Sequence, residues 1–173
     1  MSKVIIYGYS NLGSKIAKSL KNSEFEIIIV DYDEDNYNKA ILDGYNTFNK
    51  DLLEDEELIE IGIESNVKAF YCVSDSSNNN FFVTLSARNL NKKIRIISKA
   101  SSKSDSKKML LAGATKVINP YEIGALRMFR LLDKPIISHV LDKILFGDSL
   151  LNIEEFPILK GSYLDGKYLK DFD

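Results

Sequence analysis

A glycine-bounded loop near the start of the chain has the residue types and spacing of a phosphate-binding turn. It follows an apolar run at 4–7, precedes an amphipathic stretch, and consists of Gly8, Tyr9, Ser10, Asn11, Leu12 and Gly13. A strand, a glycine turn and a helix in this order bind phosphate, because the first N–H groups of the helix and its partial positive charge face the anion. Gly8 permits the tight turn, and Gly13 permits close packing of the helix on the strand.

The middle position of this loop departs from the usual dinucleotide pattern. Ser10 stands where glycine normally lets the backbone touch a pyrophosphate. Its hydroxyl can donate to a phosphate, whereas its Cβ can block the close fit of a diphosphate. The loop therefore predicts an adenine nucleotide, either NAD or one of AMP, ADP and ATP. It leaves open a fold that has kept the turn and lost the ligand.

A carboxylate follows the second apolar run at the spacing expected for ribose recognition. Asp31 lies 18 residues after Gly13, with Tyr32 beside it. In dinucleotide-binding folds an acidic residue at about this distance accepts hydrogen bonds from the ribose hydroxyls. The acids at 33–35 would repel a 2′-phosphate, which disfavours NADP, and they also suit a helix N-cap and first turn. We expect Asp31 to bind the ribose.

Two further polar loops follow apolar runs and should reach the same edge of a parallel sheet. The first contains Asp51 and Leu52, and the second contains Ser74, Asp75 and Asn78. We expect Asp51 to accept a hydrogen bond from the adenine amino group and the second loop to line the crevice where the strand order changes direction. Either loop can instead cap the helix that follows it.

The residues that usually perform nucleotide-dependent chemistry are sparse. His139 is the single histidine, and Cys72 lies inside an apolar run where a buried thiol is expected. Cysteine and histidine show no metal-ligand spacing. The sequence therefore predicts a binding domain and not an enzyme. The alternative is an NAD-dependent oxidoreductase domain that lacks its substrate lobe.

The composition suits one globular domain in a reducing compartment. The chain has 173 residues, 45% of them hydrophobic and 28% charged, with a net charge of −2 and one cysteine. This charge balance gives no reason to expect a nucleic-acid partner. The apolar runs are strand-sized and shorter than the roughly 20 residues that cross a bilayer. We therefore expect a cytoplasmic domain.

The order of elements predicts the fold class. Short apolar runs at 4–7, 27–30, 45–48, 69–73, 94–97 and 116–118 alternate with amphipathic segments. Continuous apolar runs suit strands that are covered on both faces of a parallel sheet. The sequence therefore predicts an α/β fold with a doubly wound, Rossmann-like sheet of six strands. In the fourth helix the expected apolar face comprises Phe81, Phe82, Leu85 and Leu90.

The pattern changes after Pro120. A helix is expected at 122–132, and a second helix with an apolar stripe is expected at 135–146. The stripe must pack either on the parent sheet or on another subunit. The expected organisation is a Rossmann-type lobe at 1–134, a crossover and dimerisation helix at 135–149, and the truncated start of a C-terminal lobe at 150–173.

Taken together, these segments resemble the RCK domain (regulator of potassium conductance), also known as the TrkA-N nucleotide-binding domain. The most specific part is 110–132, which contains an Ala-Gly-Ala turn, a short strand, Asn-Pro-Tyr and a helix. Five more segments carry the resemblance, at 4–13, 27–36, 50–58, 68–91 and 93–101. The resemblance covers essentially the whole chain.

The resemblance implies a cytoplasmic regulatory domain of a potassium channel or Trk/Ktr-type uptake system. Such domains form homodimers, here through the helix at 135–146, and larger gating rings joined to a pore in the inner membrane. Nucleotide binding in the cleft then gates potassium transport. A structural ring subunit whose cleft binds no ligand is a further alternative. The calcium site of some relatives is not expected, because residues 98–101 contain no carboxylate.

Overall fold

A computed structural model of the chain describes residues 2–133 together with residues 161, 163 and 166. The chain divides into two compact units, 1–124 and 125–173. The expected helix at 135–146 lies outside the described residues, as does nearly all of the expected second lobe at 150–173.

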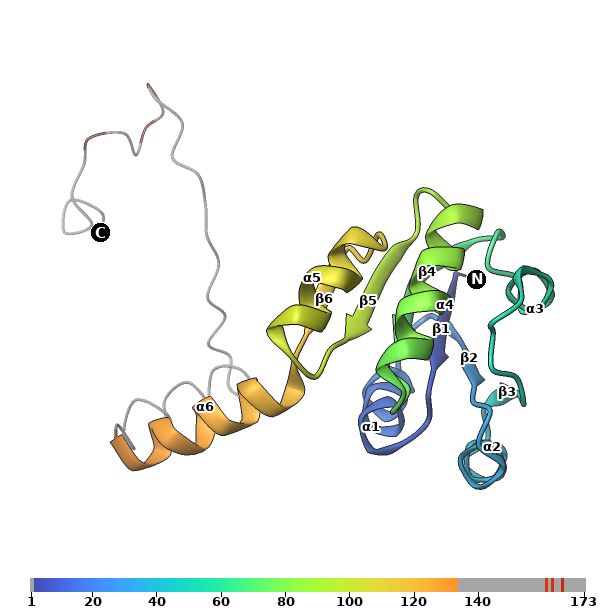
Figure 1. The fold of residues 1–173 in the computed structure, drawn as a ribbon, viewed down its shortest axis with the longest axis horizontal. Coiled ribbons are helices and arrows are strands. Elements are labelled where there is room, and N and C mark those ends of the chain that lie inside the picture. The colour runs from blue at the N-terminus through green and yellow to red at the C-terminus, as the bar shows by residue number, and fades with distance from the viewer. Residues whose placement is uncertain (1, 134–160, 162, 164–165, 167–173) are drawn as a thin grey trace. The chain divides into compact units, whose positions relative to one another are not determined.

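Six parallel strands form one sheet, which confirms the predicted fold class (Figure 1). Their order in the sheet is β3-β2-β1-β4-β5-β6. The strands are β1 (Lys3–Tyr7), β2 (Glu26–Val30), β3 (Asn46–Phe48), β4 (Val67–Cys72), β5 (Arg95–Lys99) and β6 (Lys116–Ile118). The order changes direction between β1 and β4, which is where ligands bind in sheets of this kind.

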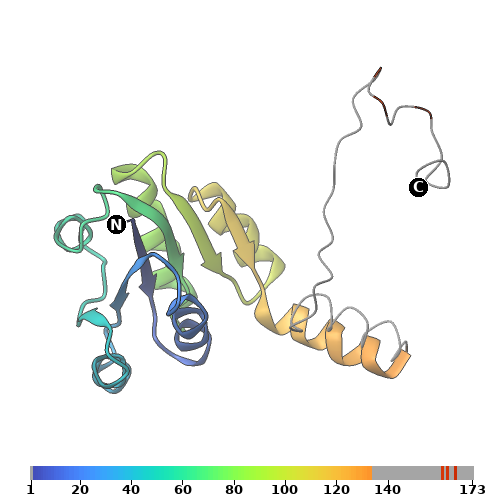
Figure 2. The same cartoon turned by 180° about the vertical axis from the view of Figure 1, so that it is seen from behind.

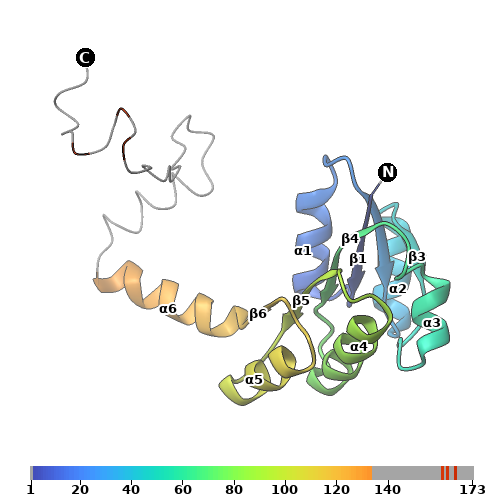
Figure 3. The same cartoon turned by 90° about the horizontal axis from the view of Figure 1, so that it is seen from above.

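Helices cover both faces of the sheet (Figures 2 and 3). The covering helices are α1 (Asn11–Leu20), α2 (Glu34–Leu42), α3 (Asp55–Glu60), α4 (Ser77–Leu90) and α5 (Lys103–Leu111), and α6 (Pro120–Asp133) follows β6. Side chains of α1 and α2 share a core with one face of the sheet, and side chains of α3 and α4 share a core with the other face. Helix α5 packs beside α4 in a smaller cluster.

The continuous apolar runs are explained by burial on both faces. Ile5 and Tyr7 belong to the core beneath α3 and α4, whereas Val4 and Ile6 belong to the core beneath α1. All four side chains are buried. A strand covered on both faces has no solvent side on which polar residues would be stable, so its sequence does not alternate.

The expected apolar face of α4 was partly wrong. Phe82 and Leu85 are 55% and 47% exposed, and the helix instead buries Asn80, Val83, Thr84 and Ala87. Polar side chains can occupy the buried face because they are hydrogen-bonded there. For example, the Thr84 hydroxyl lies 2.7 Å from the hydroxyl of Ser98 on β5. The apolar pattern was therefore right for Phe81 and Leu90, which pack against the buried clusters, and wrong for Phe82 and Leu85.

Among the described residues, no helix combines the length and apolarity needed to cross a bilayer.

Candidate nucleotide-binding site

The loops after β1 and β4 touch each other at the point where the strand order changes direction. Gly8 has φ +100°, and a Cβ built there would lie 2.4 Å from the backbone Cα of Ser74. Gly13 opens the first turn of α1, and a Cβ there would lie 1.8 Å from the carbonyl oxygen of Gly8. Both glycines are therefore required by close backbone approach, which brings the start of α1 onto the end of β1.

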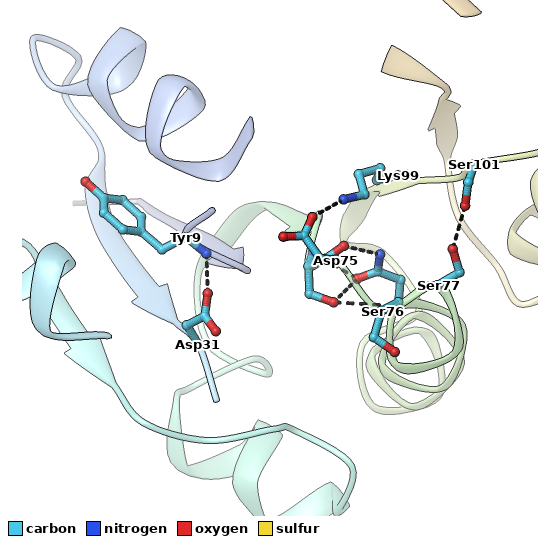
Figure 4. Close-up of polar contacts among 9 residues, drawn as sticks. Tyr9, Asp31, Asp75, Ser76, Ser77, Lys99 and Ser101 are labelled. Atoms are coloured by element: carbon cyan, nitrogen blue, oxygen red, sulfur yellow. Dashed lines mark hydrogen bonds and ion pairs between the residues drawn. The ribbon is translucent and has the colours of Figure 1, made fainter. Parts of the chain in front are cut away.

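The carboxylate of Asp31 holds the glycine loop from the neighbouring strand (Figure 4). Its Oδ2 accepts from the backbone N–H of Tyr9 at 2.5 Å, and its Oδ1 accepts from that of Asp33 at 2.9 Å. Asp31 is only 3% exposed, and this burial raises the pKa of the carboxyl above its usual 3.8. A hydrogen bond from the Asn36 side chain lowers this pKa in part. A carboxylate has about four acceptor positions, so these three bonds do not use all of them. The ribose role of Asp31 stays a prediction.

Two of the predicted site residues offer only their backbone to a ligand. The Tyr9 side chain is fully buried, and its hydroxyl donates to Asp43 Oδ2 at 2.6 Å. Leu52 is also fully buried and has φ +56°, which places its side chain in the core beneath α3 and α4. Tyr32, by contrast, is 47% exposed beside Asp31. Asp51 accepts from the backbone N–H of Leu53 at 3.2 Å.

A cavity of about 470 Å³ opens beside the start of α1. It lies at the carboxyl edge of the sheet, beside the residues that end or follow β1, β4, β5 and β6. Its lining residues are Ser10, Asn11, Leu12, Lys15, Asp75, Lys99, Pro120 and Tyr121. The structure therefore brings Ser10, Asn11 and Leu12 together with Asp75. Asn78 does not join them, because it lines a second hollow of about 320 Å³ between α4 and α5. The other predicted site residues, Asp31, Tyr32 and Asp51 among them, do not line this cavity.

An ion pair forms one wall of this cavity (Figure 4). The Nζ of Lys99, the last residue of β5, lies 2.6 Å from Asp75 Oδ1. The Lys99 side chain is 7% exposed, whereas that of Asp75 is 67% exposed. The Lys99 ammonium lowers the pKa of Asp75 below its usual 3.8, and the Ser10 hydroxyl contributes in the same direction. Asp75 therefore sits between the glycine loop and a buried cation.

Internal hydrogen bonds fix the backbone around Asp75. Ser74 is buried, and its hydroxyl lies 2.8 Å from Asn80 Oδ1, while Asn80 Nδ2 donates to the Ser74 carbonyl at 2.9 Å. On the other side, Ser76 caps α4 by accepting from the backbone N–H of Asn79 at 3.2 Å. Part of this loop thus serves its own helix, which was the alternative interpretation of its polar residues.

Four residues that line the cavity were not predicted as site residues: Lys15, Lys99, Pro120 and Tyr121. Lys99 could have been found, because it ends an otherwise apolar strand run and parallel strands present their carboxyl ends at one edge. Lys15 lies in the first helix, four residues after Asn11, on the side that faces the loop after β4. Within the described part of the chain, no group of three or more His, Cys, Asp or Glu side chains is placed to hold a metal ion.

Comparison with known proteins identifies the family. The profile of the TrkA-N domain matches residues 4–120. Potassium channel protein 1 of Methanocaldococcus jannaschii is 32% identical over 169 residues, which cover 96% of this chain and 50% of that protein. The chain thus spans about half the length of this curated relative.

Solved structures with the same fold include nucleotide-bound proteins. The GsuK channel bound to NAD has a TM-score of 0.69 and 21% identity, over 81% of this chain and 25% of that one. The AMP-bound Kef C-terminal domain of Shewanella denitrificans has a TM-score of 0.66 and 17% identity, over 82% and 87%. At these identities the likeness concerns the fold alone. The profile match over residues 4–120 and the 32% identity to a potassium channel protein show that this chain belongs to the TrkA-N domain family.

Proposed function

We propose that this domain regulates a potassium channel or potassium uptake system from the cytoplasm by sensing an adenine nucleotide. The family and the 32% identity to a potassium channel protein support the class of protein. The domain would bind and release the nucleotide without making or breaking a covalent bond in it. Its effect on transport comes from a change in how it is assembled with its partners.

The observation that carries the proposal is the cavity at the start of α1. Its lining contains Ser10 at the N-cap of α1, Asn11 and Leu12 in the first turn, and the two lysines Lys15 and Lys99. Helix N-termini and lysine ammonium groups both attract phosphate. The phosphate group would bind here, at the exits of β1 and β5.

The remaining parts of a nucleotide would extend toward β2 and β3. Asp31 holds the glycine loop at the exit of β2, and Asn49 Nδ2 donates to the Asp31 carbonyl at 3.0 Å, which joins the exits of β2 and β3. The ribose hydroxyls would reach the spare acceptor positions of Asp31. The base would lie near Tyr32 and Asp51. This path crosses the edge of the sheet, as nucleotides do in Rossmann-type folds.

The fold neighbours support a nucleotide but do not choose among nucleotides. One of those proteins binds NAD and another binds AMP. On this chain the acids that follow Asp31 argue against a 2′-phosphate. Asp33 caps α2 by accepting from the backbone N–H of Asn36 at 3.0 Å, and Glu34 and Asp35 follow in the first turn. Their negative charge would repel the additional phosphate of NADP.

Gating requires that the nucleotide bind two assembled states with different affinity, because equal affinity shifts no equilibrium. We propose a homodimer through the helix at 135–146, assembled further into a ring that acts on a membrane pore. The corresponding division into a Rossmann-type lobe at 1–134, a helix at 135–149 and the start of a second lobe at 150–173 belongs to the same proposal.

Titration calorimetry tests the binding part directly. NAD, NADH, AMP, ADP, ATP, adenosine and Ca²⁺ are titrated into the chain, and the thermal midpoint is followed in parallel because a native-state ligand raises it. We expect at least one phosphate-bearing nucleotide to bind, and Lys15→Met to weaken it. Lys68→Met, an exposed site near the amino end of β4, is the matched control and should bind normally. Failure of every nucleotide to bind would refute the proposal.

A further inference from the structure

The Asp75 carboxylate is the anion that already faces the phosphate-attracting groups of the cavity. It pairs with the Lys99 ammonium at 2.6 Å (Figure 4). It also lines the same cavity as Ser10 and Asn11. We propose that Asp75 is a built-in competitor of the nucleotide's phosphate. It neutralises Lys99 in the absence of nucleotide and gives Lys99 up when a phosphate binds. This inference rests on the proposed nucleotide site and adds the regulation of its affinity.

The difference in burial shows which partner of the ion pair can leave. Lys99 keeps only 7% of its side chain exposed, whereas Asp75 keeps 67%. A buried ammonium without a counter-charge is costly, because it has lost its hydration. A carboxylate that is two-thirds exposed can turn into water at little cost. Lys99 therefore stays in place, and the anion beside it is exchangeable.

The hydrogen bonds around Asp75 confine the exchange to its side chain. Ser74 is tied to Asn80, and Ser76 caps α4. With both neighbours held, rotation of the Asp75 side chain is the motion that remains. The backbone of the loop would stay where it is, so the exchange acts on affinity and leaves the fold unchanged.

A phosphate is a stronger competitor than Asp75 for two reasons. It carries more negative charge, and it reaches the helix N-terminus and Lys99 together. Even so, nucleotide binding must displace an existing ion pair, so part of the phosphate's attraction is offset. Removing the carboxylate should therefore strengthen the binding of phosphate-bearing nucleotides. It should leave a nucleoside without phosphate unaffected.

The test compares ADP and adenosine by titration calorimetry on the wild-type chain, Asp75→Asn and Asp75→Ser. One charge-assisted hydrogen bond corresponds to about tenfold in affinity, so we expect both variants to bind ADP about tenfold more tightly. Adenosine affinity should stay within twofold. Glu64→Gln removes the same charge at an exposed site between α3 and β4 and should leave ADP affinity unchanged.

The outcomes separate the two proposals. If the wild-type chain binds ADP and both Asp75 variants bind it equally or more weakly, the competitor role is overturned and the nucleotide site stands. If Glu64→Gln tightens ADP binding as much as Asp75→Asn, the effect is one of net charge and the inference also fails. If neither the wild-type chain nor the variants bind ADP or any other phosphate-bearing nucleotide, the proposed function fails and the inference fails with it.

Discussion

The carbonyl oxygen of Gly8 lies where a side chain on Gly13 would begin. A Cβ at position 13 would come within 1.8 Å of that oxygen, and the oxygen belongs to backbone that has little room to shift. Helix α1 and the turn after β1 therefore meet through a contact that only glycine allows. This contact sets the direction in which the first N–H groups of α1 point.

We predict that Gly13→Ala lowers the free energy of unfolding by about 3 kcal/mol, at the upper end of overpacking effects. The added methyl group forces α1 away from β1, so nucleotide affinity should fall as well. Urea unfolding measures the first effect and calorimetry the second.

Gly44→Ala is the matched control for Gly13→Ala. Gly44 has φ +85° but no atom within 4 Å of an added Cβ. Its substitution should therefore cost about 1–2 kcal/mol from backbone conformation alone. Equal losses for the two variants would show that close packing at Gly13 is unimportant.

Removing the carboxylate of Asp31 should weaken both the loop and the site. In Asp31→Ala the N–H groups of Tyr9 and Asp33 lose their acceptor. We expect a loss of about 1.5–3 kcal/mol in nucleotide binding if the carboxylate also meets the ribose. Unchanged calorimetric titration of the variant would remove Asp31 from the ligand site and leave it a purely structural role.

The pH dependence of stability gives an independent measure of Asp31. Burial raises its pKa in the folded chain above the usual 3.8, so the folded state holds the proton more tightly than the unfolded state does. The contribution of Asp31 to stability is therefore largest below pH 3.8 and declines as the pH rises through the raised pKa. The difference in thermal midpoint between wild type and Asp31→Ala should shrink over that range. A difference that grows with pH would contradict the assignment.

The sheet was predictable from the sequence because each strand carries its own signal. Ile5 and Ile6 point to opposite faces, and both are fully buried, so apolar residues without alternation identify the central strand. The Asp33 N-cap was predictable for the same reason, since it depends on residues within one turn.

The polar contacts of the site were less predictable because they join segments that are distant in sequence. The Lys99–Asp75 pair spans 24 residues and exists because β4 and β5 are neighbours in the sheet. Leu52 was predicted to lie in the site, yet its backbone has φ +56° and its side chain is buried in the core. On α4, Thr84 can be buried because its hydroxyl is hydrogen-bonded to that of Ser98, so hydrophobicity alone did not identify it as part of the buried face.

Arg88 joins the end of α4 to the turn after α5. Its Nε donates to the carbonyl of Gly113 at 2.9 Å, and its terminal nitrogens donate to the Lys92 carbonyl at 2.8 Å and the Thr115 hydroxyl at 3.1 Å. We predict that Arg88→Met lowers the free energy of unfolding by about 1.5–3 kcal/mol, because carbonyl groups lose a charged donor.

The control for Arg88 is the exposed Arg95 on β5, where Arg95→Met should change stability by less than about 0.5 kcal/mol. Gly113→Ala should also destabilise the chain, because its Cβ would lie 2.4 Å from Arg88 Cγ and its φ is +102°. Urea unfolding of the three variants measures these effects. Equal stability of Arg88→Met and Arg95→Met would contradict the role given to Arg88.

The thiol of Cys72 should resist alkylation in the folded chain. It is fully buried at the end of β4, and this burial raises its pKa to about 12. Alkylating reagents react with the thiolate, which is scarce at pH 8 when the pKa is this high. Because the chain has one cysteine, the intact mass after incubation with iodoacetamide reports this site alone. We expect labelling of the folded chain to be very slow and labelling in urea to be rapid and complete.

The rate of slow labelling at Cys72 would then measure opening of the site. Cys72 belongs to the core that α3 and α4 cover, so we expect the reagent to reach it when these helices separate from the sheet. A nucleotide bound at the carboxyl edge of the sheet, as proposed above, should suppress that opening, because it stabilises the closed form. Labelling should therefore slow as nucleotide is added and return to its original rate in Lys15→Met. Rapid labelling of the folded chain at pH 8 would show that the thiol is accessible and would contradict this account.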